Sequence, residues 1–217
     1  MSLSIQNFFD ASIFKESHDW LIAGKGPTLD KVSRDPTIVA FYKIMTLNHA
    51  VKVMPFADIA HIIDIEVLDD AKTALALDGP KYLAMPWYPH VNQRPKLGYS
   101  LPWFVERKTI LKRLFEKGRL LWYNLSSCPD RCPYVVEKSR LWTHRPIHAQ
   151  YFSAEAAFDL LSQAGAEVIH TIGIDGGSDR SAAFADIPFD NPHGTYDAQF
   201  HNIEAMAAAR GIDYKRL

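Results

Sequence analysis

Short apolar runs alternate with amphipathic stretches along most of this chain. The runs predict buried strands, and the stretches between them carry apolar residues at helical spacing, which predicts helices packed on a sheet. The expected strands are 19–23, a segment within 38–45, a segment within 57–64, 119–126 and 168–173, and the expected helices are 27–33, 67–77, 108–117, 155–165 and 198–210. Strands that alternate with helices favour an α/β domain with a doubly wound, mostly parallel sheet of the Rossmann-like class.

Residues 78–104 break this pattern. They are rich in Pro, Trp and Tyr, and we expect them to be irregular. A packed surface loop and a functional lid or acceptor platform are both consistent with such a segment. For the helix at 155–165, Ser153 is the expected cap and Gly165 is expected to end it.

The length of 217 residues favours one domain over 1–217, and 47% apolar with 23% charged residues is typical of a globular protein. The net charge of −1 gives no general basic footprint for nucleic acid. No apolar run is long enough for a transmembrane helix, and the N-terminus lacks the basic and apolar regions of a signal peptide. A cytoplasmic location is therefore expected.

The only cysteines are Cys128 and Cys132, in the segment Cys-Pro-Asp-Arg-Cys-Pro. Free thiols are favoured here. A disulfide between the two, and a zinc site completed by His144 or His148, stay open as alternatives.

The segment most informative about chemistry is Gly24-Lys25-Gly26-Pro27-Thr28, which follows the first strand. The glycines remove Cβ atoms that would block a ligand, and Pro27 suits the first position of a helix. Thr28 is expected to leave its hydroxyl and backbone N–H facing outward. Because a helix N-terminus attracts anions, we expect a phosphate at this turn. The spacing matches neither the dinucleotide-binding glycine motif nor a Walker loop.

Polar residues follow several of the other predicted strands. Ligands of doubly wound sheets bind beyond the carboxyl ends of the strands, so these residues are expected to meet the turn at one edge of the sheet. They are Asn48, Asp64, Ser126 and Asp175.

Three segments resemble small bacterial sialyltransferases that use CMP-sialic acid. Leu21-Ile-Ala-Gly-Lys-Gly-Pro-Thr28 is similar to their Ile-Ile-Ala-Gly-Asn-Gly-Pro-Ser opening. Phe152-Ser153-Ala, followed by a helix, a strand and Gly173-Ile-Asp175, is similar to their Thr-Ser-Gly, helix and Gly-Ile-Asp block. Asp190-Asn-Pro-His193 resembles their Asp-Asn-Ser-His segment. The resemblance covers 18–77 and 150–210, and 78–149 reads as an unmatched, loop-rich insertion.

The resemblance implies an enzyme that moves a sugar from a nucleotide-activated donor, with a CMP-sugar favoured, to a glycan or glycoconjugate, as in polysaccharide biosynthesis. It implies donor contacts at the Gly24–Thr28 turn and at Asn48, Asp64, Ser153 and Asp175, without a cofactor. His193 would be the general base, and His201 competes for that role. Peripheral membrane contact and a homo-oligomer stay open.

The chain departs from the family at several of these positions. Lys25 and Asp64 replace amides, Ala154 replaces a glycine, and Gly176-Gly177 replaces an aromatic pair. Arg180 and Ser178 could meet a phosphate or an acidic sugar, although a solvated loop fits them equally.

Two other functions stay open. The same motifs occur in motility-associated glycosyltransferases and in archaeal-type hydroxymethylpterin pyrophosphokinases. An ATP-dependent pyrophosphokinase would use Mg²⁺, with Asp64 and Asp175 facing the metal. A nucleotide-sugar-binding module without catalysis would keep the glycine turn and dispense with His193 and His201.

Overall fold

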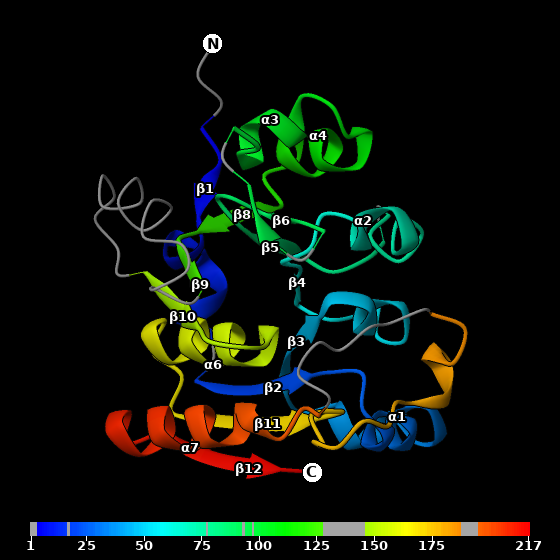
Figure 1. Ribbon diagram of the computed structural model, residues 1–217, viewed down its shortest axis with the longest axis vertical. Coiled ribbons are helices and arrows are strands. Elements are labelled where there is room, and N and C mark those ends of the chain that lie inside the picture. Colours follow the sequence, from blue (N-terminus) through cyan, green and yellow to red (C-terminus); the bar gives the residue numbers. More distant parts are fainter. Residues whose placement is uncertain are drawn as a thin grey trace.

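A parallel sheet forms the centre of the molecule (Figure 1). The computed structural model describes residues 4–16, 18–76, 78–92, 94–96, 98–127, 146–187 and 195–217. Within these residues eight strands pair in the order β1-β8-β5-β4-β3-β2-β11-β12, all in parallel. Their bounds are β1 Gln6–Asn7, β2 Asp19–Ala23, β3 Lys43–Leu47, β4 Ile59–His61, β5 Tyr82–Pro86, β8 Leu120–Tyr123, β11 Val168–Ile172 and β12 Asp213–Arg216.

Helices cover both faces of this sheet, which confirms the expected doubly wound, Rossmann-like class. The α-helices described are α1 Asp30–Arg34, α2 Val67–Asp70, α3 Leu101–Val105, α4 Thr109–Glu116, α6 Ser153–Gln163 and α7 Ala198–Arg210. Short 3-10 turns are η1 Phe8–Asp10, η2 Ser12–Lys15, η3 Pro27–Leu29, η4 Pro36–Val39, η5 Asn48–Lys52 and η6 Ala182–Phe184. Two small strand pairs lie outside the sheet, β6 His90–Val91 with β7 Arg94–Pro95 and β9 Leu125–Ser127 with β10 Ile147–Ala149.

The direction of winding changes at β2. From β2 the chain adds β3, β4, β5 and β8 on one side, and it later places β11 and β12 on the other side. The connections after β2 and β11 therefore leave the sheet in opposite directions. Such a switch point opens a crevice at the carboxyl ends of the two strands.

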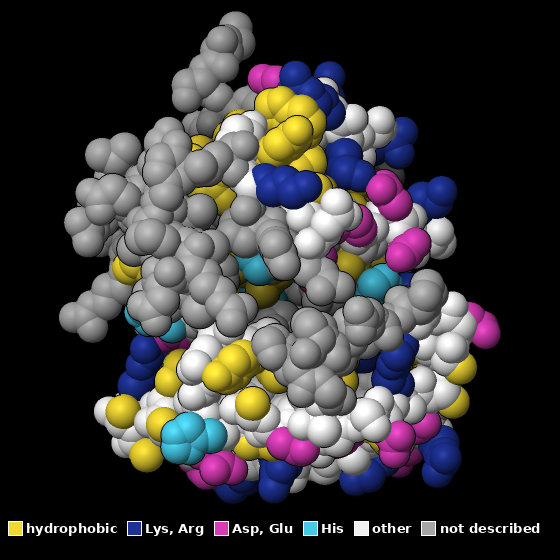
Figure 2. All heavy atoms as spheres, in the orientation of Figure 1, with side chains coloured by type: hydrophobic (Ala, Val, Ile, Leu, Met, Phe, Trp, Pro, Cys, Tyr) yellow, Lys and Arg dark blue, Asp and Glu magenta, His cyan; other side chains and the backbone are white. Residues whose placement is uncertain are grey.

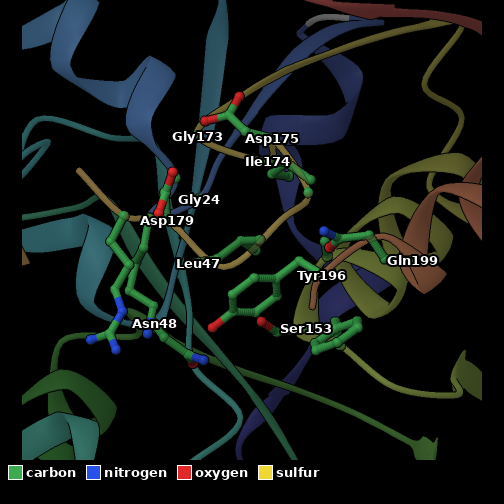
Figure 3. Close-up of a pocket in the computed structure, with 16 residues that line it drawn as sticks. Gly24, Leu47, Asn48, Ser153, Gly173, Ile174, Asp175, Asp179, Tyr196 and Gln199 are labelled. Atoms are coloured by element: carbon green, nitrogen blue, oxygen red, sulfur yellow. The ribbon is translucent and has the colours of Figure 1, made fainter. Parts of the chain in front are cut away.

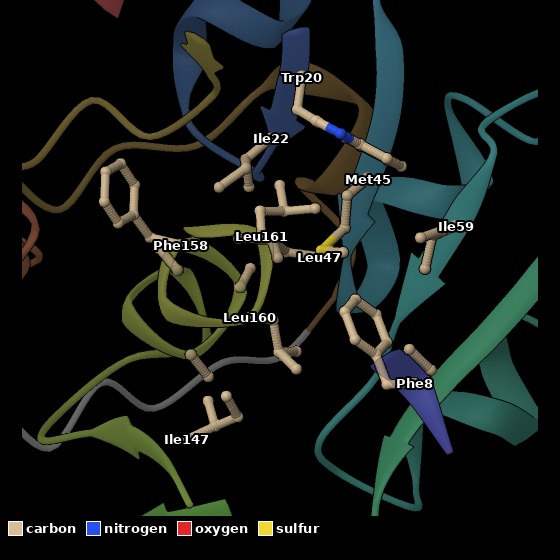
Figure 4. Packing of buried hydrophobic residues seen from close by; sticks show 14 of the residues in the cluster. Phe8, Trp20, Ile22, Met45, Leu47, Ile59, Ile147, Phe158, Leu160 and Leu161 are labelled. Atoms are coloured by element: carbon tan, nitrogen blue, oxygen red, sulfur yellow. The ribbon is translucent and has the colours of Figure 1, made fainter. Parts of the chain in front are cut away.

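Alternation along the strands divides the core between the two faces. Trp20 and Ile22 of β2 belong to the cluster that packs against α6, where Phe158 and Leu161 cover them (Figure 4). Leu21 of β2 belongs to the opposite cluster beside α1. Both faces of the strand are buried, as is usual for parallel sheets.

Several expected elements are confirmed. The strand at 19–23 and the helix at 198–210 are present with the predicted bounds, and Gly211 closes that helix in the left-handed region with a φ of 67°. The helix expected at 27–33 is divided between η3 and α1, and the strand expected within 38–45 begins only at Lys43.

Three expectations are wrong. The segment 78–104 is not irregular throughout, because Tyr82–Pro86 is a central strand between β4 and β8. Because nearly every residue of this strand is buried, its sequence shows no alternation of apolar and polar residues that would mark it as a strand. The helix at 67–77 is only the four residues of α2. Ser153 is the first residue of α6 and not its cap, and Glu155 instead accepts a 3.0 Å bond from the N–H of Tyr151.

Candidate functional site

A pocket opens at the switch point, beyond the carboxyl ends of β2 and β11 (Figure 3). The empty space between its lining atoms, including the part open to solvent, is about 530 Å³. Four parts of the chain line it: the turn after β2, the end of β3, the start of α6, and the loop after β11 together with the approach to α7. The lining residues are Gly24, Lys25, Gly26, Leu47, Asn48, Phe152, Ser153, Ala154, Gly173, Ile174, Asp175, Gly176, Asp179, Arg180, Tyr196 and Gln199.

The glycines of the first turn allow it to pack against the second. Gly26 N donates to Gly173 O at 2.7 Å. A Cβ on Gly24 would lie 2.3 Å from Gly173 O, and a Cβ on Gly26 would lie 2.5 Å from Asp175 Oδ2. The expectation that these glycines make room for a ligand therefore needs correction, because the space they leave is filled by the neighbouring turn.

Thr28 faces inward, contrary to the prediction. Its N–H donates to Asp175 Oδ2 at 2.7 Å, and its hydroxyl donates to Asp175 Oδ1 at 2.5 Å. The same hydroxyl accepts a 2.7 Å bond from Gly173 N. Asp175 thus caps the turn after β2 and uses both of its oxygens within the protein.

These bonds consume most of the backbone donors of the first turn. Gly24 N donates to Ile172 O and Leu29 N donates to Gly26 O, while Pro27 has no N–H. A phosphate at this turn would therefore depend on the side chain of Lys25 more than on a cradle of backbone N–H groups. The binding roles of Gly24, Lys25, Gly26, Pro27 and Thr28 stay predictions.

The N-terminus of α6 is open to the pocket. Phe152, which precedes the helix in an extended conformation, supplies no side-chain cap. Among the residues that the structure describes, the N–H groups of Ser153 and Ala154 donate no hydrogen bond. Both residues line the pocket, and α6 has 11 residues. A helix of this length places partial positive charge and free donors at the pocket wall.

Two cationic side chains also line the pocket. Burial lowers the pKa of Lys25 to about 8; the positive charge of Arg180 adds to this effect, and Asp64 opposes it. Arg180 is held in the loop after β11 by a 2.8 Å bond from its guanidinium to Ile187 O. The pocket therefore offers two cations to an anionic ligand, beside the carboxylates of Asp175 and Asp179.

Asn48 and Asp64 meet, as their places after neighbouring strands predicted. The Asn48 amide donates to Asp64 Oδ2 at 3.5 Å and accepts from Ile63 N at 3.2 Å. Asn48 lines the pocket, whereas Asp64 lies behind it beside His90, whose Nδ1 is 3.7 Å away. Burial raises the pKa of Asp64 to about 6, with Glu66 adding to the effect and Lys25 opposing it.

The residues present do not fit the magnesium site of the pyrophosphokinase alternative. Asp175 accepts two hydrogen bonds from Thr28, and Asp64 does not line the pocket, so the two acids do not present a pair of free carboxylates to it.

Tyr196 and Gln199 are pocket residues that the sequence reasoning did not identify. The ring of Tyr196 lies 5.0 Å from that of Phe152, and its hydroxyl end extends into the pocket near Asn48 (Figure 3). Burial raises the pKa of Tyr196 to about 12, so it stays a neutral donor at physiological pH. The sequence signal was weak, because Tyr196 precedes the helix and belongs to no motif.

Other predicted residues lie elsewhere. His193, with Asp190, and both cysteines fall outside the described residues, so their roles stay predictions. His201 is exposed on α7 and Ser178 is exposed in the loop after β11, and neither lines the pocket. Ser126 is buried in β9 and does not line it either. No helix in the described residues could span a membrane.

No protein-family model matches this sequence, and no curated protein matches it. The structure is similar to the crystal structure of alpha-2,3-sialyltransferase from Campylobacter jejuni in apo form, with a TM-score of 0.47 and 13% identity. The match covers 100% of this chain and 79% of the other. Similarity at this level concerns the course of the chain alone.

Proposed function

We propose that this protein is a glycosyltransferase that binds a nucleotide-activated sugar in the pocket at the ends of β2 and β11. The observation that carries this proposal is the convergence of the open α6 N-terminus, Lys25 and Arg180 on one cavity. The sequence resemblance favours a CMP-sugar as the donor and a glycan or glycoconjugate as the acceptor.

These groups suit the leaving nucleotide. As the glycosidic bond of the donor breaks, negative charge develops on the departing phosphate. Donors and cations that are already oriented stabilise such charge with little reorganisation. The rings of Phe152 and Tyr196 add an apolar wall for the base or the sugar.

The acceptor hydroxyl must lose its proton, and the sequence resemblance assigns this step to His193. A histidine is partly neutral near pH 7 and can then accept a proton. His193→Ala is expected to lower turnover about 10²–10⁴-fold while leaving donor binding unchanged. His201→Ala is the matched control and should retain full turnover.

Calorimetric titration with CMP, UDP, GDP and AMP, each with and without Mg²⁺, tests the binding step. We expect CMP to bind without Mg²⁺ and Arg180→Gln to weaken it by about tenfold, because one cation of the pocket is lost. Arg34→Gln, at an exposed position on α1, should bind CMP like the wild type. Failure of all four nucleotides to bind would refute the proposal.

Hydrolysis and transfer assays with CMP-sialic acid test the chemical step. Consumption of the donor, lost in His193→Ala and kept in His201→Ala, would support the transferase. Tight nucleotide binding without consumption of any nucleotide sugar would instead point to a binding module.

A further inference from the structure

A second depression lies between α2 with the turn after it and α4. This groove, defined by Leu68–Asp78 on one side and Arg107–Arg119 on the other, has an empty volume of about 1530 Å³. It shares no lining residue with the nucleotide pocket. The groove lies over the part of the sheet formed by β4, β5 and β8. It is therefore separate from the switch point at β2 and β11 and from the residues expected to contact the donor.

The rim of the groove is strongly cationic. Six Lys or Arg side chains line it against two Asp side chains, in a chain whose net charge is −1. Lys and Arg side chains, with several Asp and Glu side chains among them, are visible in the upper right part of the molecule (Figure 2). Positive charges held close together repel one another, and an anionic partner relieves that repulsion.

Half of these cations have partners within the protein. Lys108 binds Asp69 at 2.8 Å, and Arg107 lies 4.2 Å over the ring of Trp103. Arg119 donates to the carbonyl groups of Gly79 and Lys81, at 3.1 and 3.2 Å. These three side chains therefore shape the walls of the groove.

The other three cations are directed to solvent. Lys72, Arg113 and Lys117 are exposed, and none of them forms an ion pair within the described ranges. They come from both walls, since Lys72 follows α2 while Arg113 and Lys117 belong to the end of α4. An occupant of the groove would meet positive charge on both sides.

The floor of the groove is aliphatic. Leu68, Leu75 and Leu114 close the bottom of the groove and are almost fully buried, so half-buried Ile110 and exposed Ala76 present its accessible apolar surface. Accessible apolar side chains between two cationic walls suit an occupant that carries both apolar and acidic side chains. Aliphatic side chains also differ from the aromatic platforms on which sugars and bases stack.

We propose that this groove binds an acidic amphipathic segment of a partner protein. Apolar side chains at i, i+3 or i+4, and i+7 of such a segment would cover Ile110 and Ala76, and its carboxylates would meet Lys72, Arg113 and Lys117. A planar lipid surface would reach the rim but not a floor enclosed by two walls. The peptide therefore fits the groove better than a membrane does.

Fluorescence anisotropy with a designed 14-residue peptide tests this proposal. The peptide carries Leu on one helical face and Glu on the other, and a scrambled peptide of the same composition is the reference probe. We expect saturable binding of the amphipathic peptide and binding at least about tenfold weaker for the scrambled one, because only the first presents both faces together.

Two variants locate the site. The triple variant Lys72→Glu, Arg113→Glu, Lys117→Glu is expected to lower the affinity for the peptide by at least about tenfold. Ile110→Gln, which leaves the charges intact, is expected to lower it by about threefold. The matched control is Lys15→Glu, Lys31→Glu, Arg34→Glu, which reverses three exposed charges elsewhere and should bind like the wild type. Thermal melts establish that each variant is folded.

Several results would overturn the proposal. They are absence of saturable binding, equal binding of the scrambled peptide, equal loss in the control triple variant, and binding of anionic phosphatidylglycerol vesicles but not of the peptide. CMP titration of the groove variants separates this proposal from the proposed function, because their nucleotide affinity is expected to be unchanged.

Discussion

Two helix starts border the pocket at the ends of β2 and β11, and they differ in what they offer to a ligand. The turn after β2 carries the glycines and threonine that suggest a phosphate cradle, yet Gly173 and Asp175 take its donors. The start of α6 carries no glycine motif, yet its first N–H groups donate no bond within the described structure. The capacity to bind an anion therefore depends on which donors the neighbouring chain leaves open, and a glycine-rich turn does not reveal this.

The hydrogen bonds of Asp175 hold the turn after β2 against the end of β11. Asp175 joins two strand ends that must approach closely at the switch point, and charge-assisted hydrogen bonds of this kind are stronger than neutral ones. The β2 turn therefore forms a wall of the pocket, and α6, Lys25 and Arg180 form its proposed anion-binding side.

The largest effect is expected for Gly24→Ala. The new Cβ would lie 2.3 Å from the backbone oxygen of Gly173, and the two turns would have to separate. We expect the free energy of unfolding, measured by urea denaturation, to fall by about 3 kcal/mol. Ser178→Ala, exposed in the same region, should be neutral. An unchanged stability for Gly24→Ala would contradict the close packing of the turns.

A smaller loss of stability is expected for Thr28→Val. This change leaves the N–H of Gly173 without its acceptor and removes a donor from Asp175. The free energy of unfolding should fall by about 2 kcal/mol. The control is Thr37→Val, because the Thr37 hydroxyl makes a similar bond to Asp35 at an exposed position, at 2.6 Å. Equal losses of unfolding free energy in the two variants would show that the inward position of Thr28 adds no stability.

Ser153→Pro tests the other helix start. Proline removes one N–H but suits the first position of a helix, and the extended conformation of Phe152 suits a residue before proline. We expect CMP affinity to fall by about tenfold, or about 1.4 kcal/mol, with little change in the melting temperature.

Thr109→Pro is the matched control for this prediction. Thr109 is the first residue of α4 and also follows an extended residue, Lys108, but it does not line the pocket at the ends of β2 and β11. Its CMP affinity should equal that of the wild type. If the Ser153→Pro variant binds CMP with unchanged affinity, the N-terminus of α6 does not contact the anion.

The smallest effect concerns pH. Because the pKa of Lys25 is lowered to about 8, the side chain is charged below this pH and loses its proton above it. From pH 7 to pH 8 the charged fraction falls from about nine-tenths to about one half, so CMP affinity should fall about twofold. Lys25→Met should flatten this profile, whereas Lys31→Met, exposed on α1, should keep it. A wild-type profile retained in Lys25→Met would assign the pH dependence to another group.

Much of the fold could be predicted from the sequence, because strand and helix patterns are local. Residues 19–23 and 198–210 have the predicted bounds, and both depend on the burial of side chains close together in the chain. The exception is Tyr82–Pro86, a central strand buried on both faces, in which periodicity gives no signal. The meeting of Asn48 and Asp64 could also be predicted, since the ends of parallel strands lie at one edge of the sheet.

The sequence by itself thus determined the class of sheet, the edge of the sheet at which the polar residues gather and most of the segments that line the pocket. Only the tertiary structure decided which groups in that pocket are available to a ligand. Thr28 is capped by a carboxylate 147 residues away, Tyr196 enters from the approach to α7, and the groove beside α4 needs a second wall from α2. Hydrogen-bond donors and charges are satisfied by whatever lies nearest in space, and nearness in space between distant segments is a property of the packed chain.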